Sequence, residues 1–254
     1  MSHTFLTYIG GPTALVEYAG LRILTDPTFD APGSYPDPSG MTLVKTTGPA
    51  LQPTELGTLD LVLLTHHQHE DNLDESGRAL LGKVPLTLST DKAAAELGGT
   101  VSELAPGASR TVGAVTVTAT RALHGPAEVE AMTGPVIGFV LQSPGEPTVY
   151  ITGDNASLEI TEQVARDVGA IDIALIHAGA ARIPVIDAPL TFTSPDAAAA
   201  ARILSAKRVV GLHTEDWGHL SETRADLVAA FAAAGLSELL VDTPRGARVE
   251  ISAS

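Results

Sequence analysis

Three histidines and two acids lie within six residues of one segment, which reads Thr65-His66-His67-Gln68-His69-Glu70-Asp71-Asn72. Clustered imidazoles and carboxylates hold divalent metal ions such as Zn(II), Mn(II) or Fe(II). In an extended chain, residues two apart point to the same side. We therefore expect His67, His69 and Asp71 to face one side as metal ligands, and His66 to point away in a structural role.

The same segment directly follows an apolar run, residues 59–65 (LDLVLLT), which is typical of a strand buried on both faces. Open α/β folds place their sites at such strand ends. Three further candidate ligands also follow predicted strands, at residues 111–120, 148–152 and 208–212: they are His124, Asp154 and His213. Each of them alone also fits a turn cap or a hydrogen-bonded histidine, but the four strand ends together predict a metal site.

This ligand pattern resembles the metallo-β-lactamase superfamily. The superfamily signature is His-x-His-x-Asp-His after a buried strand, followed by a distant His, a distant Asp and a final His. The matching residues here are His67, His69, Asp71, His124, Asp154 and His213. The segment Leu21-Arg22-Ile23-Leu24-Thr25-Asp26-Pro27 is also similar to the branch that contains L-ascorbate-6-phosphate lactonase. The resemblance covers about residues 5–245 and implies a four-layer αββα sandwich of two similar halves.

The resemblance also implies a role for each ligand. His67, His69 and His124 would hold one metal, Asp71 and His213 would contribute to a second, and Asp154 would bridge the two. A hydroxide between the metals would attack a small ester, lactone or phosphodiester, since metal binding lowers the pKa of water. Asp71 would orient this hydroxide or take its proton. Zinc is the expected ion, with manganese or iron as alternatives.

One position departs from the signature, because Asn72 stands where the superfamily has its fourth histidine. A neutral amide is a weaker ligand than imidazole for such metals. The second site would then be weak or would take a harder ion such as Mn(II). The alternative is an enzyme with a single metal ion, and the sequence leaves both open.

Three other residues are candidates for the pocket around the metals. His177 ends the apolar run 171–176, and Trp217 lies four residues after His213. Both would line a substrate pocket, or alternatively pack structurally. His219 would donate a proton to the leaving group.

The amino-acid composition limits the kinds of molecule that this protein is expected to bind. The 254 residues contain no cysteine and carry a formal net charge of −15. Disulfides and thiolate ligands are therefore excluded, and an acidic chain without a basic cluster is a poor partner for nucleic acid. Two divalent ions would nevertheless make the cleft locally positive, so we expect a small, even anionic, substrate. The N-terminus lacks a signal-peptide pattern and no run of 18 apolar residues occurs, which favours a cytoplasmic protein away from membranes.

The remaining pattern predicts one α/β domain over residues 1–254. Strand-rich and strand–helix segments occur twice in succession, as expected for two similar halves. Residues 14–18 and 21–25 predict a hairpin, 26–40 a loop that forms a cleft wall, and 239–241 a last strand. Helices are expected at residues 74–81, 91–97, 159–168, 195–204 and 222–234.

Two other functions stay open from the sequence. An iron-dependent oxygenase or oxidoreductase on the same fold would use a similar ligand set. A catalytically silent metal-binding protein would explain Asn72 as the decay of the second site. The hydrolase is preferred because Asp154 is kept as a bridging ligand.

Overall fold

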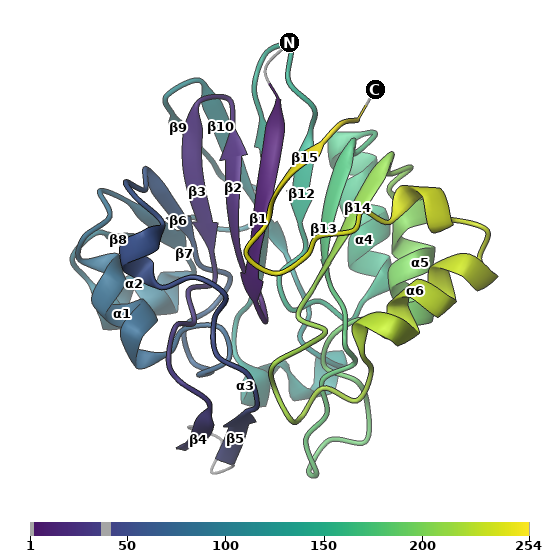
Figure 1. Ribbon diagram of the computed structural model, residues 1–254, viewed down its shortest axis with the longest axis horizontal. Coiled ribbons are helices and arrows are strands. Elements are labelled where there is room, and N and C mark those ends of the chain that lie inside the picture. The colour runs from purple at the N-terminus through teal and green to yellow at the C-terminus, as the bar shows by residue number, and fades with distance from the viewer. Residues whose placement is uncertain (1–2, 37–41, 254) are drawn as a thin grey trace.

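Two mixed β-sheets stand face to face at the centre of the molecule (Figure 1). The computed structural model describes residues 3–36 and 42–253. The first sheet has the order β15-β1-β2-β3-β6-β7-β8. Its strands are β1 (Thr4–Gly10), β2 (Thr13–Tyr18), β3 (Leu21–Thr25), β6 (Leu61–Leu63), β7 (Thr87–Ser89), β8 (Val101–Glu103) and β15 (Arg248–Ile251).

The second sheet has the order β14-β13-β12-β11-β10-β9. Its strands are β9 (Ser109–Val112), β10 (Val115–Arg121), β11 (Ile137–Gln142), β12 (Val149–Ile151), β13 (Ile173–His177) and β14 (Arg208–Leu212). A separate small hairpin joins β4 (Gly33–Pro36) to β5 (Thr42–Lys45).

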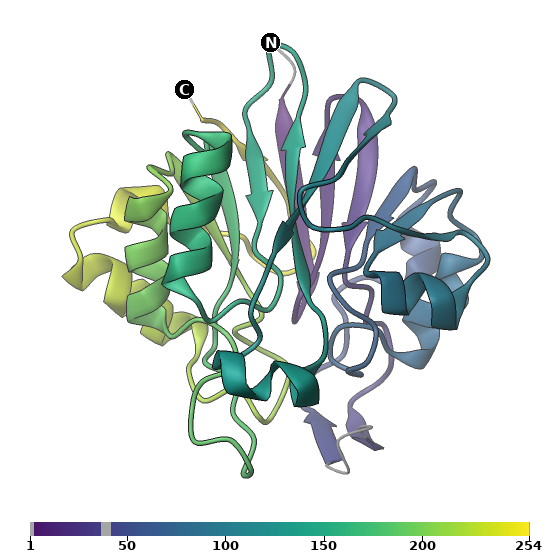
Figure 2. The same ribbon diagram turned by 180° about the vertical axis from the view of Figure 1, so that it is seen from behind.

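Helices form the two outer layers, as the front and back views show (Figures 1 and 2). The helices α1 (Glu75–Leu81) and α2 (Asp91–Leu97) lie beside the first sheet, and α4 (Leu158–Val168), α5 (Ser194–Ile203) and α6 (Arg224–Ala233) beside the second. The short α3 (Glu130–Thr133) and three 3₁₀ turns (Pro53–Glu55, Ala127–Val129 and Ser237–Leu239) complete the described elements. This αββα arrangement confirms the predicted fold class.

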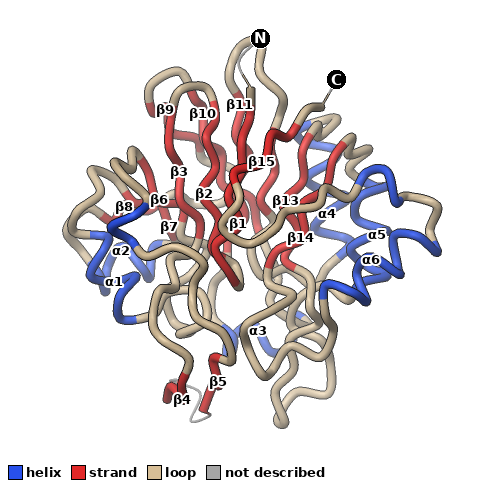
Figure 3. Tube along the Cα trace, in the orientation of Figure 1, coloured by secondary structure: helices blue, strands red, loops and turns tan. Residues whose placement is uncertain are grey.

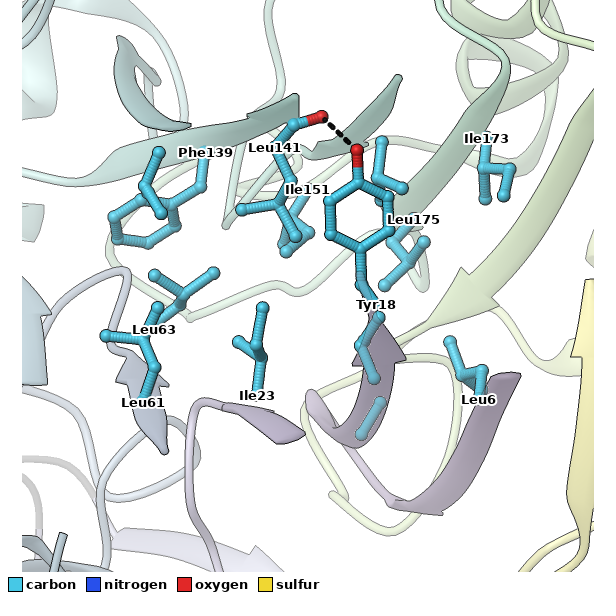
Figure 4. Close-up of a cluster of buried hydrophobic side chains, with 14 of the residues drawn as sticks. Leu6, Tyr18, Ile23, Leu61, Leu63, Phe139, Leu141, Ile151, Ile173 and Leu175 are labelled. Atoms are coloured by element: carbon cyan, nitrogen blue, oxygen red, sulfur yellow. Dashed lines mark hydrogen bonds between the residues drawn. The ribbon is translucent and has the colours of Figure 1, made fainter. Parts of the chain in front are cut away.

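The main core lies between the sheets (Figure 4). Ile23 and Leu63 of the first sheet belong to the same buried cluster as Phe139 and Leu175 of the second. Separate apolar clusters pack α1 and α2 on the first sheet and α4 to α6 on the second. Each sheet thus buries both faces, which explains the continuous apolar runs of its parallel strands.

The parallel strands bring the candidate ligands to one edge. Strands β3, β6, β7 and β8 run parallel, as do β12, β13 and β14. Their carboxyl ends lead into long loops that gather below the sheets, next to α3 and the β4–β5 hairpin (Figure 3). Residues that follow these strands therefore meet, although they are far apart in the chain.

Several predicted boundaries change in the structure. The expected strand 111–120 is a hairpin, because Gly113 turns the chain between β9 and β10 at φ +56°. The expected last strand at 239–241 is reduced to a single bridge between Leu240 and Val209 of β14. Residues 237–239 form a 3₁₀ turn, and the last strand is β15, paired with β1. The predicted loop 26–40 contains β4, and its residues 37–40 lie outside the described part.

The predicted helices agree with the structure to within two residues at each end. The N-cap of α5 is Thr193, whose hydroxyl accepts from the backbone of Asp196. No helix in the described part of the chain is long and apolar enough to cross a membrane.

Candidate metal centre

The segment after β6 forms a turn, and this reverses the predicted orientation of two histidines. The backbone amides of Asn72 and Leu73 both donate to the carbonyl of His69, at 3.1 and 3.0 Å. The chain bends at residues 67–69, before this turn, and Nε2 of His66 lies 3.1 Å from Nδ1 of His69. His67 points elsewhere, with its Nε2 at 2.8 Å from a carboxylate oxygen of Glu96 on α2. The expectation that His67 faces the ligands and His66 points away is wrong, because it assumed an extended chain.

The first cluster of candidate ligands is His66, His69 and His124. Their nearest ring nitrogens all lie within 4.8 Å of one another, the spacing needed for a shared metal ion. Nδ1 of His124 donates to the carbonyl of Leu190 at 2.8 Å, which leaves Nε2 as the free ligand atom. His66 is held in the same way, since its Nδ1 lies 2.9 Å from the hydroxyl of Thr65.

A buried carboxylate stands behind His66. One oxygen of Asp26 accepts from both the amide and the hydroxyl of Thr65, at 2.7 and 3.0 Å. Because the Thr65 hydroxyl donates to Asp26, it accepts the Nδ1 proton of His66, so Nε2 of His66 keeps its lone pair for a metal. Sequence reasoning used Asp26 only as part of a resembling segment, although its place just after β3 matches that of the other candidates.

The second cluster is Asp71, His213 and His219. One oxygen of Asp71 lies 3.1 Å from Nε2 of His213 and 3.0 Å from Nε2 of His219. His213 has a left-handed backbone, at φ +57°, and a side chain at Gly179 would collide with its carbonyl. His219 is the second imidazole of this cluster. It supplies the nitrogen ligand that Asn72, at the position of the superfamily's fourth histidine, cannot supply.

Asp154 lies between the two clusters. Its oxygens are 4.0 Å from Nε2 of His66, 3.8 Å from Nδ1 of His124 and 3.4 Å from Nδ1 of His213. Both oxygens are buried and have no hydrogen-bond partner among the described residues. Burying a carboxylate that has no hydrogen-bond partner costs folding free energy unless a cation binds to it. The donor set therefore fits divalent ions.

The two clusters differ in charge. Burial lowers the pKa of His124 to about 4 and the pKa of His66 well below its usual value, so both imidazoles are neutral at pH 7. Burial alone would raise the pKa of Asp154, but His213, His124 and His66 outweigh it and bring this pKa to about 2. Asp154 and Asp71 in turn outweigh burial at His213 and raise its pKa to about 9. The first cluster can bind a cation directly, whereas the second must first lose the proton of His213.

A cavity of about 30 Å³ opens beside both clusters. Its lining consists of Leu43, His69, Asp71, His124, Met132, Thr133, Ala181, Ile183, Leu190 and His219. His177 and Trp217, which were expected here, do not line it. His177 is fully buried, with its Nε2 3.5 Å from Asp26, and the Trp217 ring lies 6.3 Å behind the ring of His219.

The Asn72 side chain is fully buried, and neither its nitrogen nor its oxygen has a hydrogen-bond partner in the described part of the chain.

Comparison with known proteins identifies the family of this chain. Fold and clusters define a metal-dependent hydrolase of the metallo-β-lactamase superfamily. The sequence matches the β-lactamase superfamily domain over residues 21–214, and the chain belongs to this family. It is similar to a protein named UPF0173 metal-dependent hydrolase from Pyrobaculum calidifontis, with 28% identity over 246 residues that cover 94% of this chain and 96% of the relative. The superfamily and the enzyme class predicted from the sequence are thus confirmed.

Two solved structures share the fold. A possible metal-dependent hydrolase from Veillonella parvula superposes with a TM-score of 0.86 at 19% identity, covering 98% of this chain and 100% of that one. An isothiocyanate hydrolase from Delia radicum gut bacteria gives a TM-score of 0.83 at 23% identity, covering 96% and 98%. The likeness to the ascorbate-6-phosphate lactonase branch stays a prediction.

Proposed function

We propose that this chain hydrolyses a small ester, lactone or phosphodiester at a centre of two divalent ions. His66, His69 and His124 would hold one ion, Asp71, His213 and His219 the other, and Asp154 would bridge them. The observation that carries the proposal is the position of Asp154, whose two buried oxygens face both clusters and have no hydrogen-bond partner among the described residues.

Zinc is the ion that we propose for both positions. Three imidazoles, or two imidazoles and a carboxylate, are ligand sets that suit zinc. Because His219 supplies the imidazole that Asn72 cannot, the argument for a weak or manganese-selective second site loses its basis. When bound, the ions would polarise the substrate oxygen and lower the pKa of water.

The residues of the chain would position substrate and protons. Asp71 lines the cavity, and its carboxylate is placed to accept the proton of the attacking water. His219 was expected to donate a proton to the leaving group. Its Nε2 contacts Asp71 within the second cluster, and this favours a ligand role in place of that one. A small molecule remains the proposed substrate, and the acidic chain remains unsuited to nucleic acid.

Metal content and turnover test this proposal together. The purified protein should contain two zinc ions per chain by elemental analysis and should hydrolyse members of an ester, lactone and phosphodiester panel. Removal of the ions with a chelator should abolish hydrolysis, and added zinc should restore it. Iron with oxygen uptake would instead support the oxygenase, and full metal loading without turnover would support a silent metal-binding protein.

A further inference from the structure

Five of the ten residues that line the cavity are apolar, and Thr133 also lines it. Leu43 comes from β5, Met132 from α3, and Ala181, Ile183 and Leu190 come from one loop after β13. The other four lining residues belong to the two clusters of candidate ligands: His69, Asp71, His124 and His219. Among the residues that the structure describes, no lysine or arginine lines this space. A substrate group that enters it would therefore meet hydrocarbon as well as the ions that the clusters would hold.

The apolar surface continues outside the cavity. Four large hydrophobic residues are exposed in the described part, and three of them lie on the segments that line the cavity: Val44, Met132 and Val185. Val44 follows Leu43 in β5, and Val185 lies two residues after Ile183. These segments gather at the same end of the molecule, below the sheets (Figures 1 and 2). Exposed apolar surface beside a pocket marks a site that binds apolar groups.

Among the described residues, none of the cations on these segments lines the cavity. Lys45 is buried and its Nζ lies 3.1 Å from a carboxylate oxygen of Asp74. Arg121, on the strand that leads to α3, pairs with Glu130 at 3.2 Å. Arg182 is exposed and its side chain does not line the cavity. A phosphate or sulfonate inside the cavity would lose hydration without gaining a lysine or arginine partner from the residues that line it.

We infer that the substrate of this site is a small, neutral ester or lactone whose uncharged apolar group lies against Leu43, Met132 and Ile183. The inference rests on the proposed function and narrows it, because it excludes phosphodiesters and other anionic substrates. For an ester, the reaction adds one water, breaks the bond between the carbonyl carbon and the alkoxy oxygen, and yields one acid and one alcohol. The cavity itself has room for roughly two water molecules, so the larger part of the substrate rests on the apolar rim.

Two pairs of probes that differ only in charge test the inference on the zinc-loaded enzyme. The binding pair is 4-acetylphenyl methyl sulfone and 4-acetylbenzenesulfonate, in which a methyl group replaces a charged oxygen and no ester is present. Trp217 reports binding, because it is the chain's only tryptophan and its ring lies 6.3 Å from that of His219. Calorimetry checks the same affinities. The substrate pair is the acetate ester of 4-(methylsulfonyl)phenol and 4-acetoxybenzenesulfonate.

The neutral member of each pair should be preferred by about tenfold or more, in Kd and in kcat/KM. Met132→Lys should reduce this preference at least about threefold, because it adds a cation to the rim. Val228→Lys is the matched control: its parent side chain is 51% exposed, against 56% for Met132, but it lies on α6 and should leave the preference unchanged.

The outcomes separate this inference from the proposed function. Equal or tighter binding of the sulfonate, or the same preference in Met132→Lys as in the parent, would overturn the inference. A sulfonate ester that is the better substrate would leave the hydrolase intact and refute the neutral substrate. Selective binding of the neutral ketone, with neither ester cleaved at any metal loading, would support the neutral site and refute the hydrolase.

Discussion

Nε2 of His66 lies 3.1 Å from Nδ1 of His69, whereas the neighbouring His67 contacts Glu96 on the far side of the turn. This relationship places His66 in the first cluster of candidate ligands and leaves His67 outside it. Because the two histidines are adjacent in the chain, substitution of each in turn distinguishes the ligand set that contains His66 from the set that contains His67.

His66→Ala should lose the metal ion of the first cluster and at least about 100-fold in kcat/KM, since one of three imidazoles is removed. His67→Ala is the control, because it removes an equivalent side chain from the same turn and should keep both ions. Zinc content by mass spectrometry and hydrolysis rates check both variants. Loss of metal in His67→Ala with full loading in His66→Ala would show that the turn is arranged differently.

Asp26→Asn should weaken zinc binding by about 10- to 100-fold, because Asp26 holds the Thr65 hydroxyl that orients His66. Thr65→Val cuts the same connection while keeping the shape of the side chain, and should act in the same direction. Asp60→Asn serves as the control, since Asp60 accepts from the amide of Arg22 and touches neither cluster. Competition with a chelating dye measures the affinities. An unchanged zinc affinity in both Asp26→Asn and Thr65→Val would show that Asp26 does not position His66 for metal binding.

The metal-free protein should lose stability as the pH rises from about 6.5 to about 9. The folded pKa of His213 is about 9, above its ordinary value of 6.5, so the folded state holds this proton more tightly than the unfolded state. The resulting stabilisation is complete below pH 6.5 and disappears as the pH passes through 9. Zinc affinity should rise over the same interval, because the ion competes with that proton. Thermal melts with and without chelator measure both trends, and the His213→Gln variant should show neither.

His219→Ala should bind one zinc ion per chain where the parent binds two. The variant removes an imidazole that lies 3.0 Å from Asp71 in the second cluster and leaves His66, His69 and His124 intact. We expect hydrolysis to fall by at least about 100-fold. Elemental analysis decides the point: two ions in the variant would mean that His219 is no ligand. In that case, if the pH profile of kcat/KM is bell-shaped in the parent and loses one limb in His219→Ala, His219 acts as the proton donor to the leaving group.

The αββα layers and most elements could be predicted from the sequence, because apolar runs and helix caps depend on neighbouring residues. The runs that became β6, β12, β13 and β14 are apolar since both faces of each sheet are covered, and this pattern is visible locally. The same logic placed His124, Asp154 and His213 at strand ends that meet at one edge.

Only the tertiary structure decided which side chains face the centre. His66 replaces His67 because the chain bends at residues 67–69, and alternation along an extended strand cannot describe such a bend. His219 reaches Asp71 only when the loop after β14 returns over the cavity, a contact between residues 148 positions apart. Asp26 and Leu43 join the site in the same way, from the first sheet and the small hairpin. Residue type and spacing determined that this chain would hold metal, and the path of its loops in space determined with which atoms and beside which apolar wall.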